Sequence, residues 1–187
     1  MIAVGGPRRW AWAEIDLTAI EHNVRVISDA VAPAGVWAVV KANGYGHGAA
    51  AVAERALRAG ADGLCVALAA EGVALRDAGV DAPILVLSEQ PREQIGEMIA
   101  HRLTPTAYTP GYVDAWFGAL GKRAAAPSFP IHVKVDTGMQ RVGVDADSAA
   151  ALVARVAALT PTLRLEGVYT HLACADEPDA HGNAEQL

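Results

Sequence analysis

Short runs rich in β-branched residues alternate with alanine-rich amphipathic stretches along most of the chain, and this alternation restricts the possible folds more than any other feature. Such a pattern predicts parallel strands that are joined by crossover helices. After an opening segment around 12–26, strands are predicted at 36–41, 63–67, 84–88, 104–108, 130–136 and 165–171. The predicted fold class is therefore α/β, with about six strand-helix units.

Local signals support two of the helices. The stretch 52–57 carries an apolar stripe, and Gly60 follows it as a C-terminal cap. A later helix, which starts before Leu152, is expected to be capped by Asp147 or Ser148. Both helices fit the crossover positions of the strand-helix units.

Six units are too many for a small sandwich and too few for a closed (β/α)8 TIM-type barrel, which usually needs roughly 250 residues. We expect a lead-in segment at 1–34 and an incomplete barrel at 35–187, truncated where 182–187 begin a helix without a stop signal. An open doubly wound sheet is the alternative. It is disfavoured because no glycine-rich dinucleotide fingerprint follows the first repeating strand.

Composition narrows the choice of ligand and compartment. The net charge of −6, with no basic run beyond Arg8-Arg9, argues against nucleic acid and favours a small-molecule ligand. Cys65 and Cys174 lie far apart in apolar runs, so we expect buried thiols and no bridge or metal site. Without a membrane-length apolar stretch or a secretory signal, the chain is predicted to be cytoplasmic.

Only three of the 15 basic residues are lysines, and Lys41 ends the first predicted strand of the repeat. A lysine there snorkels to water in the simplest interpretation, but the glycine-rich run 42–48 that follows suits a sharp turn close to a ligand. A desolvated lysine can form an imine with an aldehyde, while glycine-rich backbone and a helix N-terminus suit a phosphate. Tyr45 adds a hydroxyl donor, and His47 is given no catalytic role.

The fifth predicted strand separates polar from apolar side chains by its two-residue period. His132, Lys134 and Asp136 fall on one face, and Ile131 and Val133 fall on the other. The apolar face is expected to meet helices, so the polar face points into the barrel interior.

Two further ionisable residues follow predicted strand ends. Arg141 emerges after the fifth strand with a fork suited to a carboxylate, although an ordinary surface arginine is the alternative. His171 ends the sixth strand. Because barrel strands present their C-terminal ends at one rim, we expect Lys41, Arg141 and His171 to converge there.

Four segments, in this order, resemble those of the alanine racemase family. They are Trp12-Ala-Glu-Ile-Asp-Leu17, Val40-Lys-Ala-Asn-Gly-Tyr-Gly-His-Gly48, Val133-Lys-Val-Asp-Thr-Gly-Met-Gln-Arg-Val-Gly143 and Gly167-Val-Tyr-Thr-His-Leu-Ala173. The resemblance spans nearly the whole chain from Trp12, and the second segment is highly specific. It implies an enzyme of the pyridoxal 5′-phosphate (PLP) fold type III class, of which this chain is the N-terminal part, without the C-terminal β-domain.

By this resemblance, Lys41 holds PLP through an imine and is one of two catalytic bases. Tyr45 binds the cofactor phosphate. Arg141 orients the phenolic-oxygen side of PLP and the substrate carboxylate, and His171 lies beside the cofactor ring in its hydrogen-bond network. Lys41, Arg141 and His171 are thus the catalytic candidates.

Lys134 resembles the lysine that is carbamylated in many family members. The modification makes physical sense, since it would turn a buried cation into an anion that can hold Arg141. If Lys134 is unmodified, Asp136 is the alternative partner of that arginine.

The implied reaction interconverts L-alanine and D-alanine, which supplies D-alanine for peptidoglycan, by a two-base mechanism in a homodimer. The resemblance places the second base beyond Leu187, so we expect the chain by itself to be inactive. Alternatives are a non-catalytic PLP-binding protein of the same barrel, another fold type III enzyme (a D-amino acid aldolase or dehydratase, or a decarboxylase) and a cofactor-free Schiff-base aldolase. Serine or broader specificity is also compatible with these residues.

Overall fold

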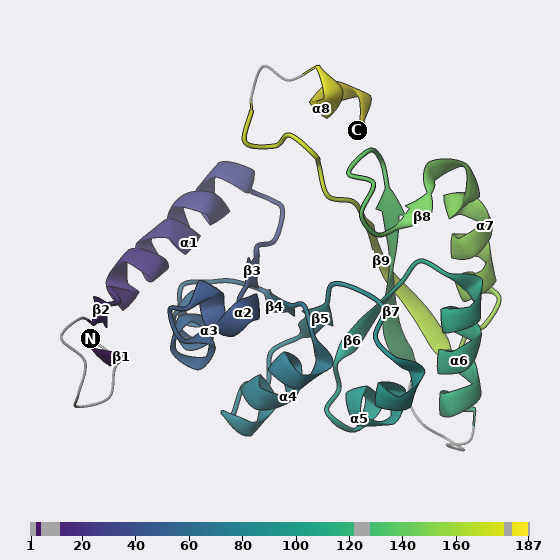
Figure 1. Ribbon diagram of the computed structural model, residues 1–187, viewed down its shortest axis with the longest axis horizontal. Helices are drawn as coiled ribbons and strands as arrows, with labels where there is room; N and C mark the ends of the chain where they lie inside the picture. The colour runs from purple at the N-terminus through teal and green to yellow at the C-terminus, as the bar shows by residue number, and fades with distance from the viewer. Residues whose placement is uncertain (1–2, 5–11, 122–127, 178–180, 187) are drawn as a thin grey trace. The chain divides into compact units, whose positions relative to one another are not determined.

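The computed structural model describes residues 3–4, 12–121, 128–177 and 181–186, which form two compact units, Met1–Leu85 and Val86–Leu187 (Figure 1). The helices are α1 (Leu17–Val31), α2 (Lys41–Tyr45), α3 (Ala49–Arg58), α4 (Ala69–Asp77), η1 (Arg92–Gln94), α5 (Ile95–Ala100), α6 (Pro110–Leu120), α7 (Ala146–Ala157) and α8 (Gly182–Glu185). The strands are β1 (Ala3–Val4), β2 (Ala13–Glu14), β3 (Trp37–Val39), β4 (Gly63–Val66), β5 (Ile84–Val86), β6 (Thr104–Ala107), β7 (Phe129–Asp136), β8 (Val144–Asp145) and β9 (Leu163–Tyr169).

All six predicted strands are present, as β3, β4, β5, β6, β7 and β9. The pairs β3–β4, β6–β7 and β7–β9 are parallel, and helices follow the strands as the alternation predicts. The α/β class with parallel strands is therefore confirmed. Most of the strands end one or two residues before the predicted position, because the chain turns into the following loop earlier than the apolar pattern indicates.

In the first unit, α1 packs on α3. Val24 of α1 lies in one buried cluster with Ala56 and Ala61, and the Glu21 carboxylate accepts a hydrogen bond from Arg55 at 2.8 Å. Val24 is 7% exposed, so one apolar contact and one ion pair together hold the opening helix to the strand-helix repeat.

Helix α3 confirms the predicted apolar stripe and its cap. Val52 and Ala56 are buried and Leu57 is half-buried, while Gly60 follows the helix with a φ of +108°. Glycine adopts this left-handed backbone without a steric penalty, which explains why the helix ends there.

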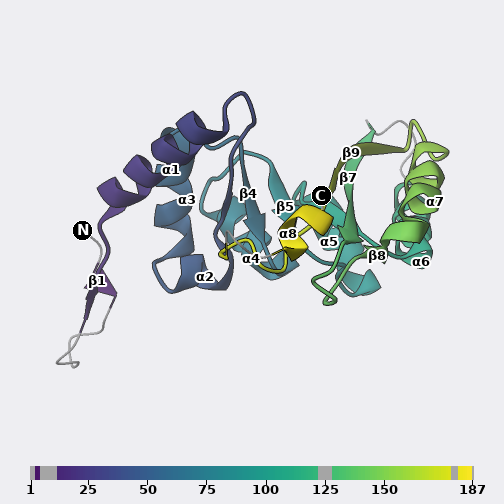
Figure 2. The same ribbon diagram turned by 90° about the horizontal axis from the view of Figure 1, so that it is seen from above.

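In the second unit, α6 and α7 lie side by side next to β7 and β9 (Figures 1 and 2). Arg155 of α7 grips Asp114 of α6 through two bonds of 2.6 Å and one of 3.0 Å. Trp116 of α6 is fully buried, with its ring 5.2 Å from that of Phe129 at the start of β7. These contacts position β7, which carries several of the candidate site residues.

Helix α7 begins earlier than predicted. Its cap is Asp145, whose side chain makes no capping bond, so the expectation of Asp147 or Ser148 was wrong. The reason is the short strand β8, which pairs Val144 and Asp145 with β7 and ends at the helix. The predicted helix start at 182–187 is confirmed as α8. The sequence also predicts an exposed connecting loop at 121–128, between α6 and β7, and most of this segment lies outside the described residues.

The cysteines are both free, but only one matches the prediction fully. Cys65 in β4 is buried, whereas Cys174 follows β9 and is half-buried, because that segment continues past the strand. In the described ranges, no helix is long and apolar enough to cross a membrane, and no cluster of three or more metal-ligating side chains is found.

Candidate functional site

Lys41 does not end a strand as predicted. Strand β3 stops at Val39, and Lys41 opens the short turn α2. Its side chain is half-buried, because the chain has already left the sheet at this point. The amide of Val40 still bonds the Cys65 carbonyl of β4 at 2.9 Å, so the residue before the lysine is fixed to the strand pair.

The turn after Lys41 winds in the left-handed sense. Ala42, Asn43 and Tyr45 have φ values of 50°, 54° and 54°, and the glycines at 44, 46 and 48 also have positive φ. The sharp turn predicted from these glycines is confirmed. A left-handed conformation costs roughly 1–2 kcal/mol for each residue with a Cβ, so other contacts must stabilise this shape.

Four backbone amides of the turn donate hydrogen bonds to carbonyl groups in the turn or directly before it. Those of residues 44, 46, 47 and 48 donate to carbonyls at 40, 42, 44 and 43, at 2.8 to 3.0 Å. The amide of Ala49 donates to the side-chain oxygen of Asn43 at 3.0 Å. These five amides are therefore already bonded within the chain, and a phosphate site formed by this backbone stays a prediction.

Tyr45 supplies the one side-chain hydroxyl in the sequence 41–48. It is 59% exposed, and the Lys41 Nζ lies 5.9 Å from the centre of its ring. The turn thus presents a primary amine and a phenol from neighbouring positions. A phenol can donate to a phosphate oxygen, which suits the phosphate contact expected of Tyr45.

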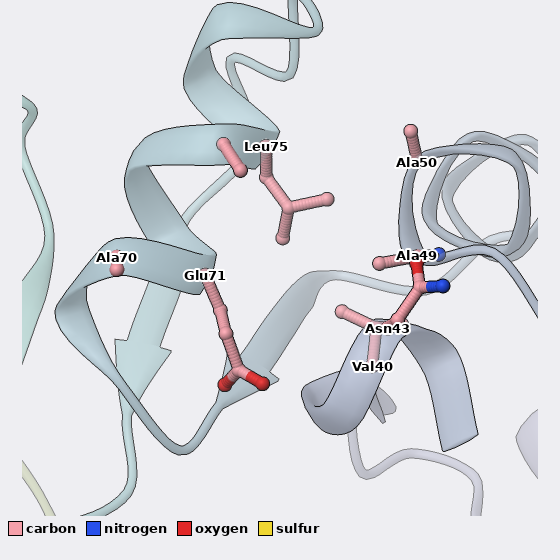
Figure 3. Close-up of a pocket in the computed structure, with 8 residues that line it drawn as sticks. Val40, Asn43, Ala49, Ala50, Ala70, Glu71 and Leu75 are labelled. Carbon is pink, nitrogen blue, oxygen red and sulfur yellow. Dashed lines mark hydrogen bonds between the residues drawn. The ribbon is translucent and has the colours of Figure 1, made fainter. Parts of the chain in front are cut away.

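Glu71 of α4 was missed by the sequence analysis. Its carboxylate accepts from the amide of Ala42 at 2.6 Å and from those of Ala67 and Leu68 at 2.8 and 3.0 Å. Figure 3 shows Glu71 and Asn43 at a cavity of about 370 Å³, which is lined by Val40, Asn43, Ala49, Ala50, Ala70, Glu71, Ala74 and Leu75. A signal was present, because a glutamate at the third position of a helix commonly bonds the amide at its start.

In the second unit, the polar face of β7 meets β9. The His132 ring lies 6.2 Å from the Tyr169 ring, and the Lys134 Nζ lies 6.0 Å from the same ring centre. Lys134 is only 5% exposed, and Ile131 and Val133 on the other face are fully buried. The predicted division of β7 into a polar and an apolar face is confirmed for these residues.

Tyr169 also joins three strands or strand ends. Its hydroxyl bonds the Thr106 hydroxyl of β6 at 2.9 Å and the Leu87 carbonyl after β5 at 3.1 Å. From the sequence, Tyr169 could be predicted only as part of a strand, because its neighbours across the sheet are distant in sequence. These contacts make it the centre of the polar interior of this unit.

His132 pairs with Glu166 of β9 at 3.4 Å between Nε2 and Oε2. Burial lowers the pKa of His132, and the nearby Glu166 carboxylate opposes this only in part. The ring is therefore held mainly in its neutral form.

Asp136 shapes the loop that leads to Arg141. Its carboxylate accepts from the amides of Gln140 and Gly138 at 2.9 and 3.0 Å, and these bonds lower the pKa of Asp136. This is a backbone role, whereas the sequence analysis considered Asp136 as a partner of the Arg141 side chain. Arg141 itself is exposed.

His171 does not end a strand as predicted, because β9 stops at Tyr169, and it is exposed. Since β7 and β9 are parallel neighbours, Arg141 and His171 both follow the C-terminal ends of adjacent strands. The structure thus places Lys41 with Tyr45 in one unit, and Lys134, Arg141 and His171 in the other. Their convergence at one rim stays a prediction.

Comparison with known proteins decides the family. Residues 15–187 match the model of the family described as alanine racemase, N-terminal domain. The chain belongs to the alanine racemase family. This family uses PLP and a TIM-type barrel, which agrees with the parallel strand-helix units described above.

Among curated relatives, alanine racemase from Synechocystis sp. is 46% identical over 174 residues, which are 92% of this chain and 46% of the relative. The solved alanine racemase from E. faecalis is 37% identical with a TM-score of 0.85, over 92% of this chain and 46% of that one. The histidine racemase from Leuconostoc mesenteroides is 28% identical with a TM-score of 0.86, over 97% of this chain and 48% of that one. The chain spans about half the length of the curated alanine racemases that it matches.

Proposed function

We propose that this chain supplies the lysine-bearing part of a PLP-dependent alanine racemase. The observation that carries the proposal is the amine of Lys41 beside the phenol of Tyr45, on a turn wound left-handed in a chain of this family. Such a turn is energetically unfavourable for residues with a Cβ, and strain of this kind clusters at functional sites.

The groups on this turn fit PLP by their chemistry. Lys41 offers a primary amine for the aldehyde and Tyr45 a hydroxyl for the phosphate, at neighbouring positions. Five amides of the turn are bonded within the chain, so we assign the phosphate contact to the Tyr45 side chain. When bound, PLP acts as an electron sink that acidifies the α-hydrogen of an amino acid.

The residues of this chain then hold and move protons around the substrate. We assign to Lys41 the removal or return of the α-proton on one side of the substrate. Arg141 is proposed to bind the substrate carboxylate with its fork of donors, and His171 to hydrogen-bond beside the cofactor. The opposing base, a homodimeric assembly and a cytoplasmic location belong to the same proposal.

Trapping with borohydride tests this assignment. In the full-length protein loaded with PLP, reduction should leave a pyridoxyl group on Lys41 and not on Lys122 or Lys134, as read by peptide mass. Lys41→Arg keeps the charge but cannot form the bond, so its adduct should vanish. Absence of an adduct on Lys41 in the unmodified protein would refute the proposal.

A racemase and a non-catalytic PLP-binding protein differ in whether they convert alanine. Interconversion of alanine enantiomers by the full-length protein supports the racemase, whereas bound PLP without turnover supports the non-catalytic alternative. We propose alanine as substrate because curated relatives named alanine racemase reach 46% identity, whereas the histidine racemase is 28% identical. Parallel assays with alanine, serine and histidine decide the specificity. The 187-residue chain by itself is expected to show no turnover, since the proposed mechanism needs an opposing base.

We also propose that Lys134 is carbamylated. It is 5% exposed on the polar face of β7, where an anion could attract a cation such as Arg141. Mass spectrometry under gentle conditions should show the added carbon dioxide on Lys134. A bare amine at saturating bicarbonate would contradict this assignment.

A further inference from the structure

We propose that Glu71 is a positioning residue for Lys41, acting through the peptide bond that joins Lys41 to Ala42. The inference rests on the proposed function, because it concerns the residue that would hold PLP. The Glu71 carboxylate accepts a hydrogen bond from the N–H of this peptide bond, with 2.6 Å between the Ala42 nitrogen and the carboxylate oxygen. Peptide bonds are planar, so a hydrogen bond that holds the plane after Lys41 also restricts the ψ angle of the lysine itself.

Backbone hydrogen bonds on both sides of Lys41 tie the chain to the same neighbouring strand-helix unit. Before the lysine, the Val40 amide donates to the Cys65 carbonyl of β4 at 2.9 Å. After it, the Ala42 amide donates to Glu71 of α4. Glu71 completes this link by accepting from Ala67 and Leu68, in the connection between β4 and α4. The backbone that carries the Lys41 side chain is thereby held to β4 and α4.

The need for such an anchor comes from the conformation of the turn. Ala42 is the first left-handed residue after Lys41, with a φ of 50°, and its Cβ makes this conformation unfavourable. The Glu71 bond holds the turn where the unfavourable run begins. At its other end, Asn43 holds the Ala49 amide and so connects the turn to α3.

Capping of α4 is an insufficient account of Glu71. A glutamate at the third helical position caps by accepting from the amide at the helix start, which here is Leu68. The bond to Leu68 is the longest of the three, and the shortest goes to Ala42, 29 positions away in sequence. The carboxylate therefore serves the lysine turn as well as its own helix.

Glu89 provides a matched control. Its carboxylate accepts from the amides of Tyr108 and Thr109 at 2.8 and 2.6 Å and from the Thr109 hydroxyl at 2.9 Å. It thus makes a similar bridge between two strand-helix loops, at a place without a candidate PLP lysine. Removal of Glu89 should disturb local structure about as much as removal of Glu71, without affecting Lys41.

The experiment uses the full-length protein and two measurements on Glu71→Ala, Glu71→Gln, Glu89→Ala and Glu89→Gln. The first is borohydride trapping of PLP on Lys41 as a function of PLP concentration, and the second is hydrogen–deuterium exchange of the peptide that covers 41–48. Glu71→Ala should raise the half-saturating PLP concentration at least tenfold, because bonds to charged acceptors are individually strong. Glu71→Gln keeps one acceptor oxygen and should fall between this variant and the unmodified protein.

The outcomes separate this inference from the proposed function. Faster exchange at 41–48 and weaker trapping in the Glu71 variants, with both unchanged within twofold in the Glu89 variants, support the inference. Trapping and exchange as in the unmodified protein for Glu71→Gln, or an equal effect of Glu89→Gln, overturn it. If Glu71→Ala does not fold, Glu71→Gln decides the question. If the unmodified protein traps no PLP on Lys41, the proposed function fails, and the exchange of 41–48 alone tests the anchor.

Discussion

The hydroxyl of Tyr169 donates a hydrogen bond to the Leu87 carbonyl at 3.1 Å. A phenol has one proton, so the 2.9 Å contact with Thr106 must be donated by the threonine. Tyr169 therefore fixes the directions of both hydrogen bonds in the polar interior of the second unit. Lys134, 6.0 Å from its ring centre, lies next to this arrangement.

Tyr169→Phe is predicted to destabilise the protein by about 1–3 kcal/mol, because the Leu87 carbonyl and the Thr106 hydroxyl lose their shared partner. Chemical denaturation measures this loss in the free energy of unfolding. Tyr45→Phe is the matched control, since Tyr45 is 59% exposed and its hydroxyl can bond water. Equal stability of the two variants would contradict the role given to Tyr169.

The two thiols are predicted to differ in reactivity. Burial raises the pKa of the Cys65 thiol to about 12, so its thiolate is scarce at neutral pH, whereas Cys174 is half-buried. Alkylation of the folded protein at pH 8, followed by peptide mass spectrometry, should label Cys174 first. Denaturation should remove the difference. Prior labelling of Cys65 in the folded protein would show that β4 is less protected than the structure indicates.

The strands could be predicted from sequence because their burial is a local property. The predicted strands at 36–41, 63–67 and 84–88 contain short apolar runs, and β4 and β5 are buried at every position. The strand ends could not be predicted as well. Apolar character continues through Val40, but the backbone has already turned toward the left-handed residues by then, and only the glycines of the following run announced this turn.

The site was predictable in its residue types and less so in its connections. Lys41, Tyr45 and the polar face of β7 were identified from spacing and from family resemblance. Glu71 and Tyr169 were not, because their importance comes from partners far away in sequence, such as Ala42 for Glu71 and Leu87 for Tyr169. Asp136 had been considered for its charge, and its backbone bonds emerge only from the fold of the loop after β7.

Stability is predicted to decrease with acid through His132. Burial holds the pKa of His132 below its usual value of 6.5 in the folded protein, against the smaller opposing effect of Glu166. As the pH falls below about 6.5, the unfolded chain binds a proton on this residue before the folded chain does, so unfolding becomes more favourable. Above this range the residue is neutral in both states and has no such effect.

Denaturation at pH 7.5 and pH 5.5 tests the role of His132. The free energy of unfolding should be lower at pH 5.5 than at pH 7.5, and His132→Asn should make this difference smaller. The exposed His22 supplies the control variant His22→Asn, which should leave the pH dependence as it is. A pH dependence unchanged by His132→Asn would assign the acid sensitivity to other groups.

Two glycines of the lysine turn are predicted to differ in their tolerance of alanine. Gly44 has a φ of +62°, and a Cβ there would lie 3.3 Å from both the Cα and the nitrogen of Ala49. Gly46 has a φ of +84°, but a Cβ would meet nothing within 4 Å. Both substitutions impose a left-handed alanine, and only that at Gly44 also presses on the backbone at the start of α3.

Gly46→Ala should therefore cost about 1 kcal/mol of unfolding free energy, which is the conformational penalty alone. Gly44→Ala should cost more, about 2–3 kcal/mol, because the backbone of Ala49 cannot move away as a flexible side chain would. Chemical denaturation of the two variants side by side measures the difference. Because the turn carries Lys41, trapping of PLP should weaken in the same order. Equal losses of stability would mean that α3 can shift to accept the new methyl group. The packing of α3 against the lysine turn would then not be needed to hold the turn in place.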